Sequence, residues 1–126
     1  MTYQVYYGDK KQSAEGFDSV DIVLTTYGTL QGEWLAHKDE TKPQGALLAY
    51  AWKRVILDEA HCIKNTATVA SKASCLLQAE RRWCVSGTII QNSLDDVYAQ
   101  MKFLRHEPWC QYSFWKGAVS NKLRSN

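Results

Sequence analysis

Four short apolar runs alternate with polar segments along the 126-residue chain. Three of them are almost continuously apolar, which is typical of strands buried on both faces, as in a parallel sheet. A polar or small residue follows each run, where such sheets place their functional loops. The pattern predicts four strands, at Tyr3–Tyr7, Asp21–Thr25, Arg54–Asp58 and Arg82–Ser86.

A first helical pattern follows the third predicted strand. Asn65 or Thr66 is a candidate N-cap, because a short polar side chain can accept a hydrogen bond from the first turn. Four apolar residues then recur at the spacing of one helix face. They are Val69, Ala73, Leu76 and Leu77.

A second and clearer helical pattern follows the fourth predicted strand. Ser93 is its candidate N-cap, and Asp95 and Asp96 occupy the first turn, where the helix dipole favours negative charge. Pro108 ends this region. The predicted buried face consists of Leu94, Val97, Tyr98, Met101 and Leu104.

The remaining segments complete the organisation. Gly32–Gly45 is polar, contains Pro43 and five charged residues, and is therefore predicted to be a surface loop or insertion over residues 32–45. An aromatic-rich segment runs from about Gln111 to Val119. Strands that alternate with helices predict an α/β fold.

Composition excludes some kinds of site but does not identify a function. The net charge of +2 gives no overall basic field, so any case for nucleic acid has to rest on local sites. The four cysteines have no metal-site spacing, and we expect free, mostly buried thiols and no zinc. No apolar run approaches the roughly 20 residues of a membrane helix, and the first residues lack a signal-peptide pattern. We expect an intracellular protein without a membrane partner.

The most informative stretch is the end of the third predicted strand. An apolar run there leads directly into Asp58 and Glu59, followed by Ala60 and His61. A carboxylate next to phosphates is a suitable ligand for a magnesium ion, which prefers oxygen and keeps several waters. Phosphoryl transfer to water also needs a group that orients or deprotonates that water. The alternative is that the strand ends in a solvated acidic turn without chemistry.

Three blocks in order along the chain resemble the Swi/Snf-type helicase-related ATPases of superfamily two. Asp21–Tyr27 resembles the motif often called Ib, Trp52–Asn65 resembles motif II, the Walker B element, and Arg82–Asn92 resembles motif III. Within this family, Leu77–Trp83 resembles the branch of the helicase-like transcription factor and the postreplication-repair translocases. That branch often carries a RING ubiquitin-ligase insert, which these residues do not contain.

The resemblance implies a partial RecA-like lobe with a mostly parallel sheet flanked by helices. Residues 1–126 would be the C-terminal part of the first RecA-like helicase ATP-binding lobe, beginning about two strands into it. It also implies an ATP-dependent double-stranded-DNA translocase of the chromatin-remodelling and DNA-repair type, located in the nucleus. The implied cofactors are ATP and Mg²⁺, and the implied partners are duplex DNA, nucleosomes and a second RecA-like lobe.

The resemblance assigns site residues to three groups. Asp58 would bind magnesium, directly or through water, Glu59 would activate the attacking water, and His61 would sense the nucleotide. Ser86, Gly87 and Thr88 would couple the nucleotide site to DNA movement through the Walker B carboxylates. Contacts to DNA would come from Thr25, Thr26, Tyr27, Lys64 and Gln91.

Each assignment has a structural alternative. Thr25–Tyr27 suits an ordinary strand-to-helix cap with Tyr27 packed in the core, and Ser86–Thr88 suits a plain glycine turn. Gln91 and Asn92 suit helix capping. The tryptophans are expected in the core, and a partial lobe is expected to expose apolar sheet edges and faces.

Two departures from the family pattern limit the function. Ile89 stands where the family usually has proline, which frees φ and adds a backbone donor. No G-x-x-x-x-G-K-[ST] phosphate loop occurs in these residues. We therefore expect this chain alone to be inactive as an ATPase, with a non-catalytic or degenerate interaction protein as the alternative. A DEAH-type RNA helicase is a weaker alternative.

Overall fold

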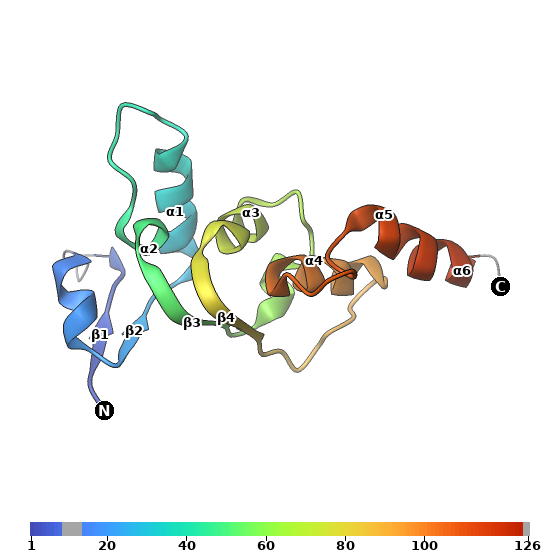
Figure 1. Ribbon diagram of the computed structural model, residues 1–126, viewed down its shortest axis with the longest axis horizontal. Helices are drawn as coiled ribbons and strands as arrows, with labels where there is room; N and C mark the ends of the chain where they lie inside the picture. Colours follow the sequence, from blue (N-terminus) through green and yellow to red (C-terminus); the bar gives the residue numbers. More distant parts are fainter. Residues whose placement is uncertain (9–13, 125–126) are drawn as a thin grey trace.

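The computed structural model describes residues 1–8 and 14–124. Four parallel strands form two two-stranded sheets, and Figure 1 shows them following one another in chain order. In the first sheet β1 (Tyr3–Val5) pairs with β2 (Ile22–Leu24), and in the second β3 (Ala51–Leu57) pairs with β4 (Gln78–Cys84). The predicted α/β fold with parallel strands is confirmed.

Helices connect these strands, as parallel pairing requires. The 3-10 helix η2 links β1 to β2, α1 and α2 link β2 to β3, and η3 and α3 link β3 to β4. Figure 1 shows the remaining helices on the β4 side, leading away from the N-terminal strands. The helices are η2 (Ala14–Ser19), α1 (Tyr27–His37), α2 (Ala46–Ala49), η3 (Ala60–Ile63), α3 (Val69–Leu76), α4 (Asp95–Leu104), α5 (Tyr112–Trp115), η4 (Lys116–Ser120, a π-helix) and α6 (Asn121–Arg124).

All four predicted strands run too far at their carboxyl ends, since β1 ends at Val5, β2 at Leu24, β3 at Leu57 and β4 at Cys84, and β2 begins at Ile22. The starts of β3 and β4 need the larger correction. Strand β3 begins at Ala51 rather than Arg54, and β4 begins at Gln78 rather than Arg82. The missed starts were not recognised because charged residues, Lys53 in β3 and Glu80 and Arg81 in β4, interrupt the apolar pattern. They nevertheless pair in register, with Ala51 opposite Gln78 and Arg54 opposite Arg81.

Helix starts also differ from prediction. The N-cap of α3 is Thr68, whose hydroxyl accepts from the Ser71 N–H at 3.3 Å. The predicted cap Asn65 instead accepts from the Ala67 N–H at 2.9 Å, in the turn before the helix. Helix α4 begins at Asp95 with Leu94 as its N-cap, so the predicted N-cap Ser93 lies one residue too early.

Apolar side chains gather in two cores. A first core lies under β2 and β3 and contains Tyr6, Phe17, Leu30, Leu47, Leu48, Ala73 and Leu77. A second core lies at the carboxyl end of β3 and contains Leu57, Ala60, Ile63 and Phe103. Phe103 is fully buried, although the stripe predicted for α4 omitted it. Burial of side chains this large contributes about 1.5–3 kcal/mol each, so the second core anchors the end of β3 firmly.

The segment predicted as a surface loop is partly helical. Helix α1 continues to His37, so only residues 38–45 of the range 32–45 connect it to α2. Glu33, expected at the surface, is 3% exposed. Its carboxylate accepts from the Tyr6 hydroxyl and the Leu47 N–H, both at 2.9 Å. Gly45 lies so close to this carboxylate that a Cβ there would overlap it.

One face of the strands is open. Val23 and Val55 pack against the first core, whereas Leu24, Ile56 and Trp83 are 50%, 59% and 56% exposed. Parallel sheets are usually covered on both faces. The expectation of burial on both faces is therefore wrong for the described residues. The expectation of an exposed apolar face is met, and Trp83 and Trp109 depart from the core placement predicted for the tryptophans.

The structure tests two expectations that came from composition, mostly buried cysteines and no membrane-spanning helix. All four cysteines are free, but Cys62 is exposed and the other three are only half-buried. Burial raises the pKa of the Cys84 thiol to about 11, so this thiol stays protonated near neutral pH. Across the described residues, no helix has the length and apolar character needed to span a bilayer.

Replacement of Glu33 tests the interior carboxylate. Glu33→Ala leaves the Tyr6 hydroxyl and the Leu47 N–H without their acceptor, and each unsatisfied donor costs about 1–3 kcal/mol. We expect the free energy of unfolding, measured by urea denaturation of the chain, to fall by about 3 kcal/mol. Glu40→Ala, at an exposed residue of the following loop, is the control and should leave it nearly unchanged. Equal stability of the two variants would contradict this role of Glu33.

Candidate functional site

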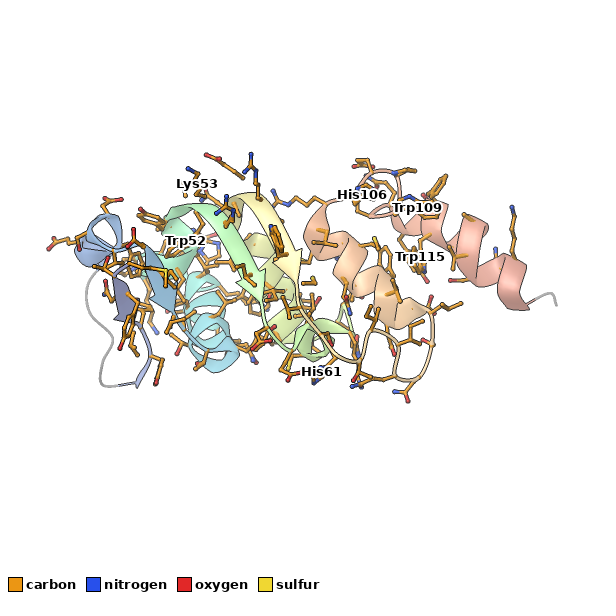
Figure 2. The ribbon with its side chains drawn as sticks, turned by 90° about the horizontal axis from the view of Figure 1, so that it is seen from below. Trp52, Lys53, His61, His106, Trp109 and Trp115 are labelled. Atoms are coloured by element: carbon orange, nitrogen blue, oxygen red, sulfur yellow. The ribbon has the colours of Figure 1, made fainter. Side chains whose placement is uncertain are left out.

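The predicted site residues gather where β2, β3 and β4 end. The loops after β3 and β4 share one edge of their sheet, which is the usual position of ligand sites in α/β folds, and the segment after β2, from the other sheet, lines a groove with the end of β3. Figure 2 shows His61 near the end toward which β3 and β4 point, whereas Lys53, near the start of β3, lies at the opposite end. The site residues come from the segments Thr25–Tyr27, Asp58–Lys64 and Ser86–Gln91.

The acidic turn after β3 has a distinctive backbone. Asp58 Oδ1 accepts from the N–H of Glu59 at 2.9 Å. Glu59 has φ 48° and ψ 50°, a left-handed conformation that is uncommon outside glycine and typically costs about 1–3 kcal/mol. The buried neighbours Leu57 and Ala60 hold the turn from both sides. Both carboxylates remain exposed, as binding of a hydrated divalent cation requires.

Backbone hydrogen bonds join this turn to the end of β4. The N–H of Val85 donates to the carbonyl of Leu57 at 2.8 Å, and the N–H of Ala60 donates to the carbonyl of Val85 at 3.0 Å. The β3–β4 pairing therefore extends past both strand ends. It brings the segment after β3 beside the segment after β4.

His61 links these two segments through its side chain. Its Nδ1 lies 3.2 Å from Glu59 Oε2 and 3.4 Å from Ser86 Oγ. Ser86 Oγ also accepts from the Thr88 N–H at 3.2 Å, which closes a tight turn around Gly87. The resemblance implied a link from this turn directly to the carboxylates; the contact that the structure shows runs through His61.

Tyr27 occupies a position under the acidic turn. Its hydroxyl donates to the backbone carbonyl of Asp58 at 2.8 Å, and its ring packs against the second core. Burial is the largest cause that raises the pKa of this hydroxyl, and the thiols of Cys62 and Cys84 and the carboxylates of Asp58 and Glu59 raise it further. Tyr27 therefore remains a hydrogen-bond donor near neutral pH and supports the turn.

Two threonines precede Tyr27, and both hydroxyls have partners within the protein. Thr25 Oγ1 donates to the carbonyl of Tyr6 at 2.7 Å. Thr26 caps α1, accepting from the Thr29 N–H at 3.1 Å. The structural alternative for this segment, an ordinary strand-to-helix cap, is therefore observed. Contact with DNA phosphates stays a prediction for these residues.

Lys64 and Gln91, both predicted to contact DNA, lie together. The ammonium of Lys64 donates to the side-chain carbonyl of Gln91. Lys64 follows η3, and Gln91 belongs to the segment that precedes α4. This pair is a second link between the segment after β3 and the segment after β4.

A groove of about 550 Å³ lies between β2 and β3. It places the segment after β2 and the acidic turn on one surface. Its walls are apolar along the strands, apart from Arg54, and polar at the strand ends. The polar end is lined by Thr25, Thr26, Tyr27, Asp58 and Glu59.

One residue gains importance from the structure. Sequence reasoning assigned Asp96 only to the first turn of a helix, but its carboxylate accepts from the Ser93 N–H at 3.3 Å and from two preceding N–H groups. The signal was the spacing of Ser93 and Asp96, which matches a capping box.

Comparison with known proteins places this geometry in a family. The sequence profile of the SNF2-related domain matches residues 1–126. DNA repair protein RAD5A of Arabidopsis thaliana is 39% identical over 120 residues, covering 94% of this chain. DNA repair protein RAD5 of Saccharomyces cerevisiae is 38% identical over 136 residues, covering 99% of it. This chain spans 12% of the length of each relative.

A solved structure supports the same family assignment. The Sulfolobus solfataricus SWI2/SNF2 ATPase core in complex with double-stranded DNA superposes with a TM-score of 0.76 and 28% identity, covering 99% of this chain and 24% of that one. The resemblance to a RecA-like lobe of Swi/Snf-type ATPases is thereby confirmed. The chain belongs to the SNF2-related domain family.

Proposed function

We propose that this chain supplies the magnesium-binding and water-activating carboxylates of an ATP-dependent motor that moves along double-stranded DNA. The observation that carries this proposal is the exposed Asp58–Glu59 turn, anchored at the end of β3 and joined through His61 to Ser86. Relatives that are DNA repair proteins, and a structural neighbour in complex with duplex DNA, support it.

The acidic residues fit a magnesium site beside a nucleotide. Asp58 offers an exposed carboxylate that would hold the ion directly or through water, and a single carboxylate is sufficient beside phosphates. Magnesium, when bound, neutralises the negative charge of the phosphates. Glu59, of which 66% of the side chain is exposed, would orient and deprotonate the attacking water.

Coupling would pass through the turn after β4. His61 contacts both Glu59 and Ser86, so a change in nucleotide state at Glu59 reaches Ser86 through one side chain. Ser86 is bonded to Thr88 across Gly87, and the segment continues to Gln91. Gly87 lets the backbone turn tightly there.

DNA would be held through its phosphates. Lys64 is the cation of this site, and Gln91 holds its ammonium. Thr25, Thr26 and Tyr27 border the same groove as the carboxylates, and the backbone N–H groups of such a segment can position phosphates without reading sequence. This mode suits a motor that acts on DNA of any sequence.

The chain would act as one part of a larger machine. We propose that residues 1–126 form the C-terminal part of the first RecA-like lobe and work against a second lobe, on duplex DNA and nucleosomes in the nucleus. A phosphate-gripping loop would come from elsewhere in the longer protein, since these residues contain none. A non-catalytic interaction protein derived from such a motor is the alternative.

Glu59→Gln in the longer protein that carries this chain tests the catalytic assignment. The amide keeps the shape of the side chain but cannot take a proton. We expect DNA-stimulated ATP hydrolysis to fall by about 100-fold or more, the usual contribution of a general base, while nucleotide binding persists. Glu40→Gln is the matched control and should leave turnover unchanged. Turnover of the Glu59 variant at the wild-type rate would exclude the assignment.

The isolated chain offers a second test. Without a phosphate loop it lacks most contacts to a triphosphate, so we expect no measurable ATP hydrolysis by residues 1–126, with or without duplex DNA. A coupled assay of phosphate release from the purified chain measures this. Robust DNA-stimulated hydrolysis would refute the expectation and show that these residues bind ATP in another way.

Lys64→Ala tests the phosphate contact. Loss of one phosphate contact should weaken duplex binding by the longer protein to a similar extent for all sequences. The fall of log affinity with log salt should also become less steep, by about 1 in the magnitude of the slope. Fluorescence anisotropy across a KCl series measures both quantities. Lys72→Ala, at an exposed residue of α3, is the control; an unchanged slope for the Lys64 variant would contradict the contact.

A further inference from the structure

Asp96 is a buried carboxylate that the proposed chemistry does not use. Its side chain is 8% exposed. Oδ2 accepts from the N–H groups of Asn92 at 2.8 Å, Gln91 at 3.0 Å and Ser93 at 3.3 Å. These hydrogen bonds, led by the one from Asn92, together with the nearby charge of Lys64, hold the pKa of Asp96 below its ordinary value. The carboxylate is therefore charged at neutral pH.

These contacts exceed what a helix cap needs. Helix α4 begins at Asp95 with Leu94 in the cap position, so the N–H groups of Gln91 and Asn92 lie upstream of the helix. Asp96 thus gathers the backbone of the preceding segment around one oxygen. Three N–H groups that would otherwise bond to water point at the same charge, which fixes the path of this segment.

The fixed segment is the one that meets Lys64. The backbone of Gln91 is held by Asp96, and its side-chain carbonyl receives the ammonium of Lys64. The charge of Asp96 also attracts Lys64. At the other end, the contacts described for this segment are those of Ser86 with Thr88 and with His61, and Ile89 lacks the ring that would restrict φ. Asp96 is therefore the main restraint on where Gln91 places Lys64.

We propose that Asp96 is a positioning residue for DNA binding, which acts through Gln91 to hold the Lys64 ammonium ready for a phosphate of the duplex. This inference rests on the proposed contact between Lys64 and DNA. A long side chain that is already ordered loses less entropy when it binds, so restraint of Lys64 raises the affinity for DNA.

The neighbouring Asp95 provides a matched control. It has the same chemistry and lies in the same first turn of α4. Its carboxylate, however, accepts from the Ser120 hydroxyl at 2.8 Å and lies 3.4 Å from the Trp115 indole nitrogen. Those partners belong to the C-terminal helices and not to the segment that holds Lys64.

The experiment is a double-mutant cycle in the longer protein that carries this chain. Binding of a fluorescein-labelled duplex is measured by anisotropy for Asp96→Asn, Gln91→Ala, Lys64→Ala and the double variant Asp96→Asn with Lys64→Ala. Asp96→Asn and Gln91→Ala should each weaken binding about threefold to tenfold, the cost of ordering one long side chain. In the Lys64→Ala background, Asp96→Asn should weaken it less than twofold. Asp95→Asn should bind like the wild type.

Other results would overturn the proposal, and they separate its parts. If Asp96→Asn binds like the wild type, or weakens binding equally with and without Lys64, Asp96 does not act through Lys64. If Lys64→Ala itself binds like the wild type, the proposed DNA contact of Lys64 fails, and this inference fails with it. Where Asp96→Asn does not fold, Asp96→Glu, which keeps the charge on a longer side chain, takes its place in the cycle and is judged by the same outcomes. Gln91→Ala tests the link from Gln91 to Lys64, and wild-type binding by that variant would also overturn the proposal.

Discussion

The parallel register of β3 and β4 is the constraint on which the rest of the site depends. The bond from the Val85 N–H to the Leu57 carbonyl, and the bond from the Ala60 N–H to the Val85 carbonyl, extend this pairing beyond the strands. Because the ladder continues, the segments after the two strands leave the sheet side by side. The contacts from His61 to Ser86 and from Lys64 to Gln91 follow from that geometry.

The second core lets this edge combine rigidity with exposure. Leu57, Ala60, Ile63 and Phe103 are buried directly beneath the acidic turn, which fixes its backbone, including the left-handed Glu59. The two carboxylates themselves point to solvent and have no buried ion pair among the described contacts that would neutralise them. Apolar packing thus carries the stability of the site, and its charges stay available for a cation and a water molecule.

The sequence predicted which helices and strands form better than it predicted where they begin and which of their polar residues are buried. Continuous apolar runs revealed four strands, but the starts of β3 and β4 were missed, because charged residues interrupt the apolar pattern there and register with the neighbouring strand decides where pairing begins. The polar composition of Gly32–Gly45 concealed a helical continuation, since Tyr6 and Leu47, which hydrogen-bond to the buried Glu33, lie far from it along the chain. Motif order correctly indicated which residues gather at the site. It did not indicate that His61 and Asp96 connect them, because such contacts depend on three-dimensional placement.

The proposed motor requires Asp58 and Glu59 to face the phosphates of a bound nucleotide. The most direct measurement is a structure of the longer protein that carries this chain, with Mg²⁺, a non-hydrolysable ATP analogue and duplex DNA. We expect Asp58 at the magnesium ion, directly or through one water, and Glu59 beside the water that faces the terminal phosphate. A nucleotide bound away from the end of β3, with both carboxylates solvated, would contradict it.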